Sequence, residues 1–205
     1  HIGGAIGVLD DLAPREIWEG VPVPAHQDLT TLREIAATRG IAWRTIRNGA
    51  RLEVAGVTVE AIHPLEPDWE RQKVRNDDSI VLRVRFGAVE FVLTGDAGAE
   101  FERRLPPDLD RAAVRILKAG HHGSRTSTGE SLVRALRPHA ALISAGRANL
   151  FGHPAPDVVA RLERAGVEIF RTDRDGAISL ETDGVTVRVR TALGRLWTIV
   201  APNAF

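Results

Sequence analysis

The stretch Leu117-Lys118-Ala119-Gly120-His121-His122-Gly123-Ser124 ends a short apolar run in two adjacent histidines. Residues 113–117 predict a buried strand, and the glycines on either side of the histidine pair predict a sharp end to it. If the strand geometry continued, the two imidazoles would point to opposite faces, so that one could bind a metal while the other faced a substrate. The alternative is a surface histidine pair in a glycine loop.

Outward from this stretch, the chain reads as β-hairpins followed by alternating strands and helices. Helices are expected at residues 5–12, 28–38, 97–105, 129–136 and 156–165. Strands are expected at residues 16–18, 41–46, 51–54, 57–62, 79–86, 89–93, 113–117, 140–144, 167–170, 177–180 and 185–189. The loop at 64–75 is charged, and residues 196–205 fit an edge strand or a truncated connection. This order predicts one α/β domain over residues 1–205, with two sheets face to face and helices outside.

Composition narrows the chemistry that the chain can perform. Lys and Arg total 27 and Asp and Glu total 27, so no global charge steers the protein toward nucleic acid. A polyanion would have to meet a local basic patch or bound metals. The chain has no cysteine, which excludes disulfide partners and thiolate metal ligands. Histidines and carboxylates remain as the candidate ligands.

Asp96 follows the predicted strand at 89–93 directly after Gly95. A carboxylate at a strand end, beside a glycine that allows close approach, can bridge two cations. The alternative is an N-cap for the predicted helix at 97–105, a position that Asp favours.

Other polar residues have weaker local signals. His153 precedes a helix, where it could receive an anionic oxygen, although the segment taken alone favours a simple turn histidine. Residues 173–176 predict a turn between strands, and residues 76–79 predict either a strand-capping turn or a polar wall near a metal. His1 alone would be an ordinary chain end. His26, His63 and His139 are interpreted as structural.

Several motifs taken together resemble one family. They are His1-Ile2-Gly3-Gly4, the run from Asn76 to Ser79, Thr94-Gly95-Asp96, the stretch from Leu117 to Ser124, Phe151-Gly152-His153-Pro154 and the run from Thr172 to Gly176. In this order they resemble the metallo-β-lactamase-like domain at the C-terminal end of ComEC-type competence DNA-uptake proteins. The resemblance extends from His1 to about residue 190.

The resemblance implies an αββα sandwich with two divalent metal ions, Zn or Mn, at one edge. His1 would be the last histidine of the family's metal motif, Asp96 the bridging carboxylate, and His122 the late ligand, with His121 as the alternative ligand. It also implies that the first strands and the upstream part of the metal motif are missing from residues 1–205. Catalytic roles are expected for His121 and His153, and substrate contacts for Ser124, Lys118, Arg125 and Asn76.

The implied activity is a two-metal phosphodiesterase that acts as a DNA nuclease and degrades the strand not taken up during transformation. Its partners would be single-stranded DNA, held by phosphate contacts, and the membrane-channel portion of the parent protein. Its place would be the extracytoplasmic side of the cytoplasmic membrane. Two alternatives are a hydrolase of the same superfamily that acts on a small phosphodiester, and a non-catalytic DNA-binding or channel module.

Overall fold

The structure is a computed structural model that describes residues 2–65, 73, 75–105 and 112–202. Three sheets carry its strands: one of seven strands, one of three and one of two. None of the helices within these ranges combines the length and apolarity that a membrane crossing requires.

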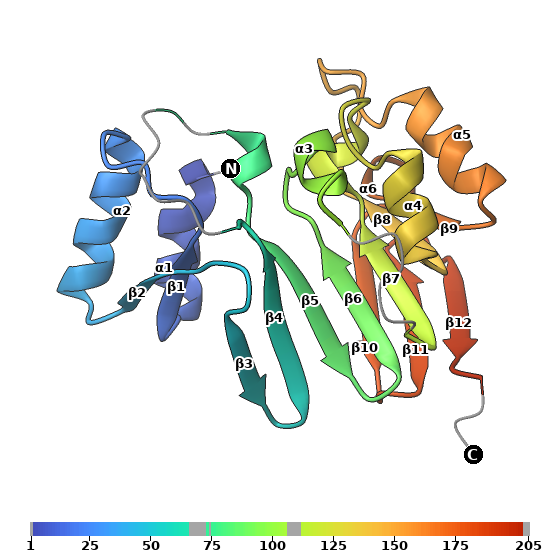
Figure 1. The fold of residues 1–205 in the computed structure, drawn as a ribbon, viewed down its shortest axis with the longest axis horizontal. Coiled ribbons are helices and arrows are strands. Elements are labelled where there is room, and N and C mark those ends of the chain that lie inside the picture. The colour runs from blue at the N-terminus through green and yellow to red at the C-terminus, as the bar shows by residue number, and fades with distance from the viewer. Residues whose placement is uncertain (1, 66–72, 74, 106–111, 203–205) are drawn as a thin grey trace.

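The seven-stranded sheet forms the centre of the molecule (Figure 1). Its strands, in spatial order, are β3 (Arg51–Val54), β4 (Val57–His63), β5 (Val81–Phe86), β6 (Val89–Leu93), β7 (Val114–Lys118), β8 (Ala140–Ile143) and β9 (Glu168–Arg171). Strands β3 to β6 pair antiparallel, whereas β6 to β9 pair parallel. The carboxyl ends of β6 to β9 therefore meet at one edge of the sheet, which is where α/β folds commonly place ligands.

A second, antiparallel sheet packs against one face of the first. It contains β10 (Ile178–Thr182), β11 (Thr186–Thr191) and β12 (Leu196–Val200). Alternation along β11 buries Val187 and Val189, which join one core cluster with Val114, Ile116 and Phe170 of the large sheet. The two sheets thus share an apolar layer, as the alternating sequence pattern predicts.

Helices cover the opposite face of the large sheet. These are α3 (Ala99–Glu102), α4 (Glu130–Leu136) and α5 (Pro156–Arg164), which Figure 1 shows together above β6 to β9. Phe101 and Leu132 pack with Leu117 in one cluster, while Val158 and Leu162 belong to another. The N-terminal part forms a separate group beyond β3 and β4 in Figure 1, made of α1 (Ala5–Leu12), α2 (Gln27–Thr38) and the parallel pair β1 (Glu16–Glu19) and β2 (Ala42–Thr45).

The predicted α/β architecture with two sheets face to face is confirmed. Most element boundaries agree within two residues, and residues 196–200 form the expected edge strand on β11. Two local predictions differ. The helix expected at 97–105 is only the single turn α3, and the turn expected at 173–176 is the short helix α6 (Thr172–Asp175) ending at Gly176.

Candidate metal and substrate site

The ends of β6 and β7 are tied together by three hydrogen bonds. The hydroxyl of Thr94 donates to the carbonyl oxygen of Lys118 over 2.8 Å, and Lys118 Nζ donates to the carbonyl oxygen of Gly95 over 2.9 Å. The backbone N–H of His121 donates to that same Gly95 oxygen over 3.2 Å. Burial lowers the pKa of Lys118, and the nearby charge of Asp96 opposes this effect. The segment that carries Asp96 is therefore fixed to the segment that carries the histidines.

Asp96 does not cap a helix. The helix α3 begins at Ala99, and Gly98 occupies the N-cap position without a side-chain cap. The N–H of Gly98 donates instead to Asp77 Oδ1 over 3.0 Å, while the N–H of Asp96 itself donates to Ser79 Oγ over 3.1 Å. The helix-cap interpretation of Asp96 is thus wrong, because the chain continues for two residues before the helix starts. Only 14% of the Asp96 side chain is exposed.

The histidine pair departs from strand geometry. His121 and His122 both adopt left-handed backbone conformations, with φ of 45° and 57°, inside the 3-10 turn Gly120–Gly123. The expectation that strand alternation would separate the two rings is therefore wrong, because the chain has already turned at Gly120. A Cβ at Gly120 would lie 2.7 Å from the carbonyl oxygen of Ala97, so only glycine fits there. Left-handed non-glycine residues are strained and cluster at functional sites.

His122 lies beside Asp96. Its Nδ1 donates to the backbone carbonyl oxygen of Ser144 over 2.8 Å, which fixes the proton on Nδ1 because a carbonyl can only accept. Its Nε2 lies 3.7 Å from Asp96 Oδ1. An imidazole held by a carbonyl through one nitrogen, with the other nitrogen beside a carboxylate, is a usual arrangement for a metal ligand. This geometry fits His122, more than His121, to the ligand role.

His121 and His153 form a second group next to this pair. Their ring centroids are 5.7 Å apart at an interplanar angle of 69°. Asn76 Nδ2 lies 3.3 Å from His121 Nε2, and Thr126 Oγ1 lies 3.5 Å from His121 Nδ1. Burial lowers the pKa of His153, and the neighbouring histidines lower it further while Asp96 opposes them. The neutral imidazole that this lowered pKa favours at His153 can accept or donate a hydrogen bond to a substrate.

A cavity of about 340 Å³ opens beside His153. It is lined by Ser124, Arg125, Thr126, Phe151, Gly152, His153, Ala155 and Pro156. The ring of Phe151 stacks on His153, with centroids 5.9 Å apart at 22°, yet 82% of Phe151 is exposed. The sequence alone assigned no role to Phe151. Two large apolar residues, Leu150 and Phe151, stand directly before Gly152 in a loop, and this pattern could have indicated the exposed apolar surface that the structure shows.

The four predicted substrate-binding residues have different surroundings. Asn76 lies at the His121 ring, and Ser124 Oγ exchanges a hydrogen bond with Thr126 Oγ1 over 3.1 Å on the wall of the cavity. Arg125 is largely exposed, with Nε 3.4 Å from Asp157 Oδ2. Lys118 is half-buried and holds the backbone at Gly95. Their contacts with a substrate stay predictions.

The metal set is only partly visible. His1 lies outside the described residues, so its predicted ligand role stays a prediction. Asp173 pairs with Arg171 at 2.7 Å, and hydrogen bonding to Arg171 lowers the pKa of Asp173. Within the described ranges, no group of three or more histidines and carboxylates is placed to hold a metal. Asp96 and His122 supply two suitable donors.

The chain is similar to known proteins over most of its length. Residues 1–147 match the metallo-beta-lactamase superfamily. ComE operon protein 3 of Bacillus subtilis (strain 168) is 33% identical over 145 residues, which are 71% of this chain and 18% of that protein. Competence protein ComA of Neisseria gonorrhoeae is 34% identical over 125 residues, 60% of this chain and 18% of that protein. Recombination protein 2 of Haemophilus influenzae is 38% identical over 114 residues, 56% of this chain and 14% of that protein. The chain thus spans 18% or less of the length of these relatives, whose names are consistent with the ComEC-type competence family.

Proposed function

The chain belongs to the metallo-beta-lactamase superfamily, and from that premise we propose that it is a metal-dependent phosphodiesterase that acts as a DNA nuclease. Members of this superfamily are generally hydrolases and usually bind divalent metals. The names of the relatives, which refer to competence and recombination, support DNA as the substrate. The biological role would be to degrade the strand that is not transported during natural transformation.

One observation carries the proposal: Asp96 Oδ1 and His122 Nε2 lie 3.7 Å apart at the carboxyl ends of two parallel strands. An oxygen and an imidazole nitrogen, without thiolates, suit Zn or Mn. Asp96 and His122 would hold the two ions together with His1, while Ser144 and Ser79 orient the two described ligands. Bound there, the ions would lower the pKa of water and stabilise charge on the phosphodiester oxygens.

The remaining side chains would position the substrate. His121 and His153 would hydrogen-bond to oxygens of the phosphodiester and help to stabilise the charge that develops on them. Asn76 would orient the His121 ring, since its amide lies 3.3 Å from Nε2. Ser124, Arg125 and Lys118 would contact or neutralise neighbouring phosphates, either directly or by shaping the loops.

We also propose the setting of this activity. Residues 1–205 would form one domain of a longer protein, on the extracytoplasmic side of the cytoplasmic membrane, next to a membrane channel that carries single-stranded DNA. The relatives support this setting because they are more than five times as long as the matched segments.

The test combines metal content with digestion of single-stranded DNA, both measured on the longer protein that includes the upstream part of the metal motif. We expect the protein to bind two divalent ions and to cleave DNA, and we expect Asp96→Ala to lower the rate by about 10²–10³-fold or more. His122→Gln should lose metal, whereas His26→Gln, a histidine outside this site, should retain both metal and activity.

Two results would contradict these proposals separately. A protein that holds two metals but leaves DNA intact would exclude the nuclease; hydrolysis of a small phosphodiester by that same sample would then identify the alternative substrate class. Unchanged cleavage by Asp96→Ala would exclude the assigned site while leaving the nuclease activity in place.

A further inference from the structure

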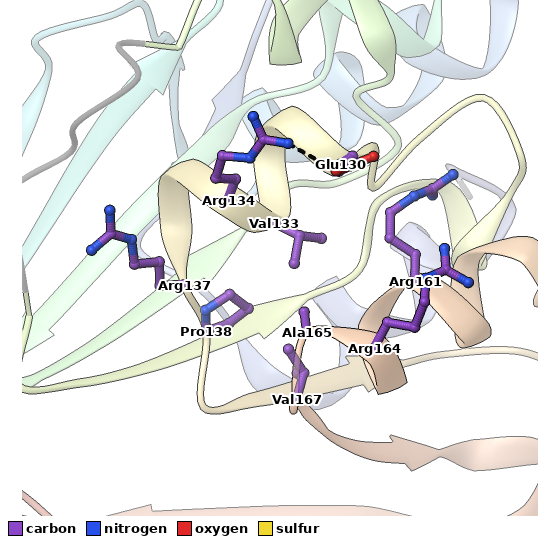
Figure 2. A pocket seen from close by; sticks show the side chains of 9 residues that line it. All are labelled: Glu130, Val133, Arg134, Arg137, Pro138, Arg161, Arg164, Ala165 and Val167. Atoms are coloured by element: carbon purple, nitrogen blue, oxygen red, sulfur yellow. Dashed lines mark hydrogen bonds and ion pairs between the residues drawn. The ribbon is translucent and has the colours of Figure 1, made fainter.

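We propose that the groove between α4 and α5 binds the phosphate backbone of a single DNA strand as it leaves the catalytic edge. This proposal rests on the nuclease function proposed above, because it names the path of the same substrate. The groove encloses about 490 Å³ and is separate from the cavity beside His153. Figure 2 shows its lining: Glu130, Val133, Arg134, Arg137, Pro138, Arg161, Arg164, Ala165 and Val167.

The lining is strongly basic although the whole chain is neutral. Four arginines face a single glutamate, which gives a formal charge of +3 from four positive and one negative side chains. Arg134 and Arg137 come from α4 and its C-cap, and Arg161 and Arg164 come from α5 on the other side of the groove (Figure 2). The guanidinium group presents a planar fork of donors that matches phosphate oxygens. A concentration of such groups on one surface is the electrostatic footprint of a nucleic-acid site.

These arginines are only partly engaged within the protein. Arg134 pairs with Glu130 at 2.8 Å, but both side chains are about three-quarters exposed, so the pair is readily exchanged for a ligand. Arg161 donates through one nitrogen to the carbonyl oxygen of Thr128 over 2.8 Å. Within the part of the chain that the structure describes, Arg137 and Arg164 have no carboxylate at ion-pair distance.

The spacing along α5 also argues for a ligand. Arg161 and Arg164 are three residues apart on α5, so they place like charges on one helix face. Like charges at this spacing destabilise a helix. A phosphate between them would remove that repulsion. The floor of the groove is apolar, formed by Val133, Ala165 and Val167, and can lie under the sugars of a strand.

The position of the groove connects it to the candidate site. Pro156, the first residue of α5, lines the cavity that contains His153, and Arg161 and Arg164 follow on that same helix. At a rise of 1.5 Å per residue, they stand about 7.5 Å and about 12 Å further along α5. The phosphates of a stacked strand are spaced by about 3.4 Å, so the groove would hold phosphates roughly two to four nucleotides from the catalytic edge. The groove therefore lies further along the same helix as the substrate cavity.

The test measures binding of single-stranded DNA to the full chain in the presence of EDTA, so that no cleavage occurs. The probes are a long oligothymidylate and a trinucleotide. In the double variant Arg137→Gln/Arg164→Gln, we expect affinity for the long probe to fall about tenfold, because two phosphate contacts are lost. The slope of log K against log salt should fall by about 1.4, which is about 0.7 for each lost contact to a single strand.

The matched control is Arg188→Gln/Arg190→Gln, which removes two exposed arginines from β11 of the other sheet. It should leave the salt slope unchanged, and both double variants should leave binding of the trinucleotide and hydrolysis of a small phosphodiester unchanged. Thermal midpoints equal to that of the wild type would show that both variants fold.

Results for the groove and for the nuclease are distinguishable. If the groove variant and the control have equal affinities and equal salt slopes, the groove proposal is wrong even when the wild type cleaves DNA. If the wild type fails to cleave DNA but the groove variant alone loses affinity, the nuclease is wrong and the groove is supported. A charge reversal, Arg137→Glu/Arg164→Glu, should weaken binding further, and tighter binding would overturn the proposal.

Discussion

The two ends of β6 and β7 carry polar groups with opposite purposes. At their carboxyl ends, Asp96 and His122 stand at the sheet edge with the donor geometry of a ligand site. Nearer their amino ends, Glu90 on β6 and Arg115 on β7 are buried partners in register. Both ends thus place charge on the same two strands, and what differs is how completely the protein itself satisfies that charge.

The amino-terminal end is closed by a complete ion cluster. Glu90 is 1% exposed; its Oε2 accepts from Arg83 at 2.9 Å and from Arg85 at 2.6 Å, and its Oε1 accepts from Arg115. Arg115 also donates to the carbonyl oxygen of Leu136, at the C-terminus of α4. The three arginines share the single carboxylate of Glu90, so both oxygens of Glu90 are already occupied and little of it is left for a ligand.

The carboxyl-terminal end is more exposed, since 14% of the Asp96 side chain and 31% of the His122 side chain are accessible to solvent. Ser79 and Ser144 hold the backbone of Asp96 and the ring of His122, and they carry no charge that would neutralise a bound cation. Left-handed strain at His121 and His122 is retained there as well. One strand pair thus carries a buried ion cluster at one end and a partly exposed candidate ligand site at the other, because burial is nearly complete only at Glu90 and Arg115.

The largest predicted effect comes from removing the carboxylate at the centre of the Glu90 ion cluster. Glu90→Gln would leave the buried Arg115 and Arg83 without their counter-charge, and breaking a buried ion pair in this way costs about 3–5 kcal/mol. For a chain of this size we expect the thermal midpoint to fall by roughly 6–20 °C. Calorimetry or a circular dichroism melt measures this directly.

The control for that prediction is Asp96→Asn, beyond the carboxyl end of β6. It removes a charge from the same strand system, but we expect the free energy of unfolding to change by less than about 1 kcal/mol, because the charged neighbour Lys118 is only half-buried and keeps its hydrogen bond to Gly95. If the two variants melt at the same temperature, the proposed division between the two ends is wrong.

The Glu90 ion cluster also shows what the sequence could and could not predict. Alternation in residues 79–86 predicts the strand, and a glycine turn predicts the hairpin that returns as β6. The pattern does not reveal that Arg83 is buried, because alternation implies one solvated face and here α3 and α4 cover that face. Tertiary packing, which no local pattern contains, converts a basic stripe into an ion cluster.

At the carboxyl ends of β6 and β7, the sequence predicted the types of polar residue but not their geometry. The sequence placed Asp96 and the histidine pair each after a predicted strand, and the parallel pairing of β6 and β7 brings these two strand ends together. The partners that position them are Ser79 and Ser144, and these are distant in sequence from Asp96 and His122. The arginine groove was missed for a similar reason, since α4 and α5 become neighbours only when both pack on the sheet.

A smaller effect would sharpen the description of the carboxyl ends of β6 and β7. Phe151 is 82% exposed and stacked on His153, so it offers an aromatic face to a nucleobase at the mouth of the cavity. Phe151→Ala should weaken binding of single-stranded DNA by about 1–3 kcal/mol, the usual worth of one stacked base. Leu150→Ala is the matched control, because it removes exposed apolar surface without an aromatic ring. Equal losses in both variants would argue against stacking.

The smallest effect concerns a second buried glutamate, Glu102 of α3, which is influenced by one arginine, Arg161, where Glu90 pairs with three. It is 5% exposed, its Oε2 accepts from the N–H of Gly129 over 2.8 Å, and within the described ranges its Oε1 has no hydrogen-bond partner. Burial raises the pKa of Glu102 above its ordinary value of 4.5, against the opposing hydrogen bonds. The folded state therefore binds this proton more tightly than the unfolded state does. Its contribution to stability is full below pH 4.5 and is lost as the pH rises through the folded pKa.

Glu102→Gln keeps an acceptor for Gly129 and removes the titration, so urea unfolding should show a flatter dependence on pH above 4.5 than in the wild type. Glu130→Gln, at an exposed position, should leave the wild-type dependence intact. Parallel curves for the wild type and Glu102→Gln would mean that the protein offsets the cost of burying the Glu102 carboxylate. The contrast between a fully paired and a partly paired buried charge would then be limited to β6 and β7.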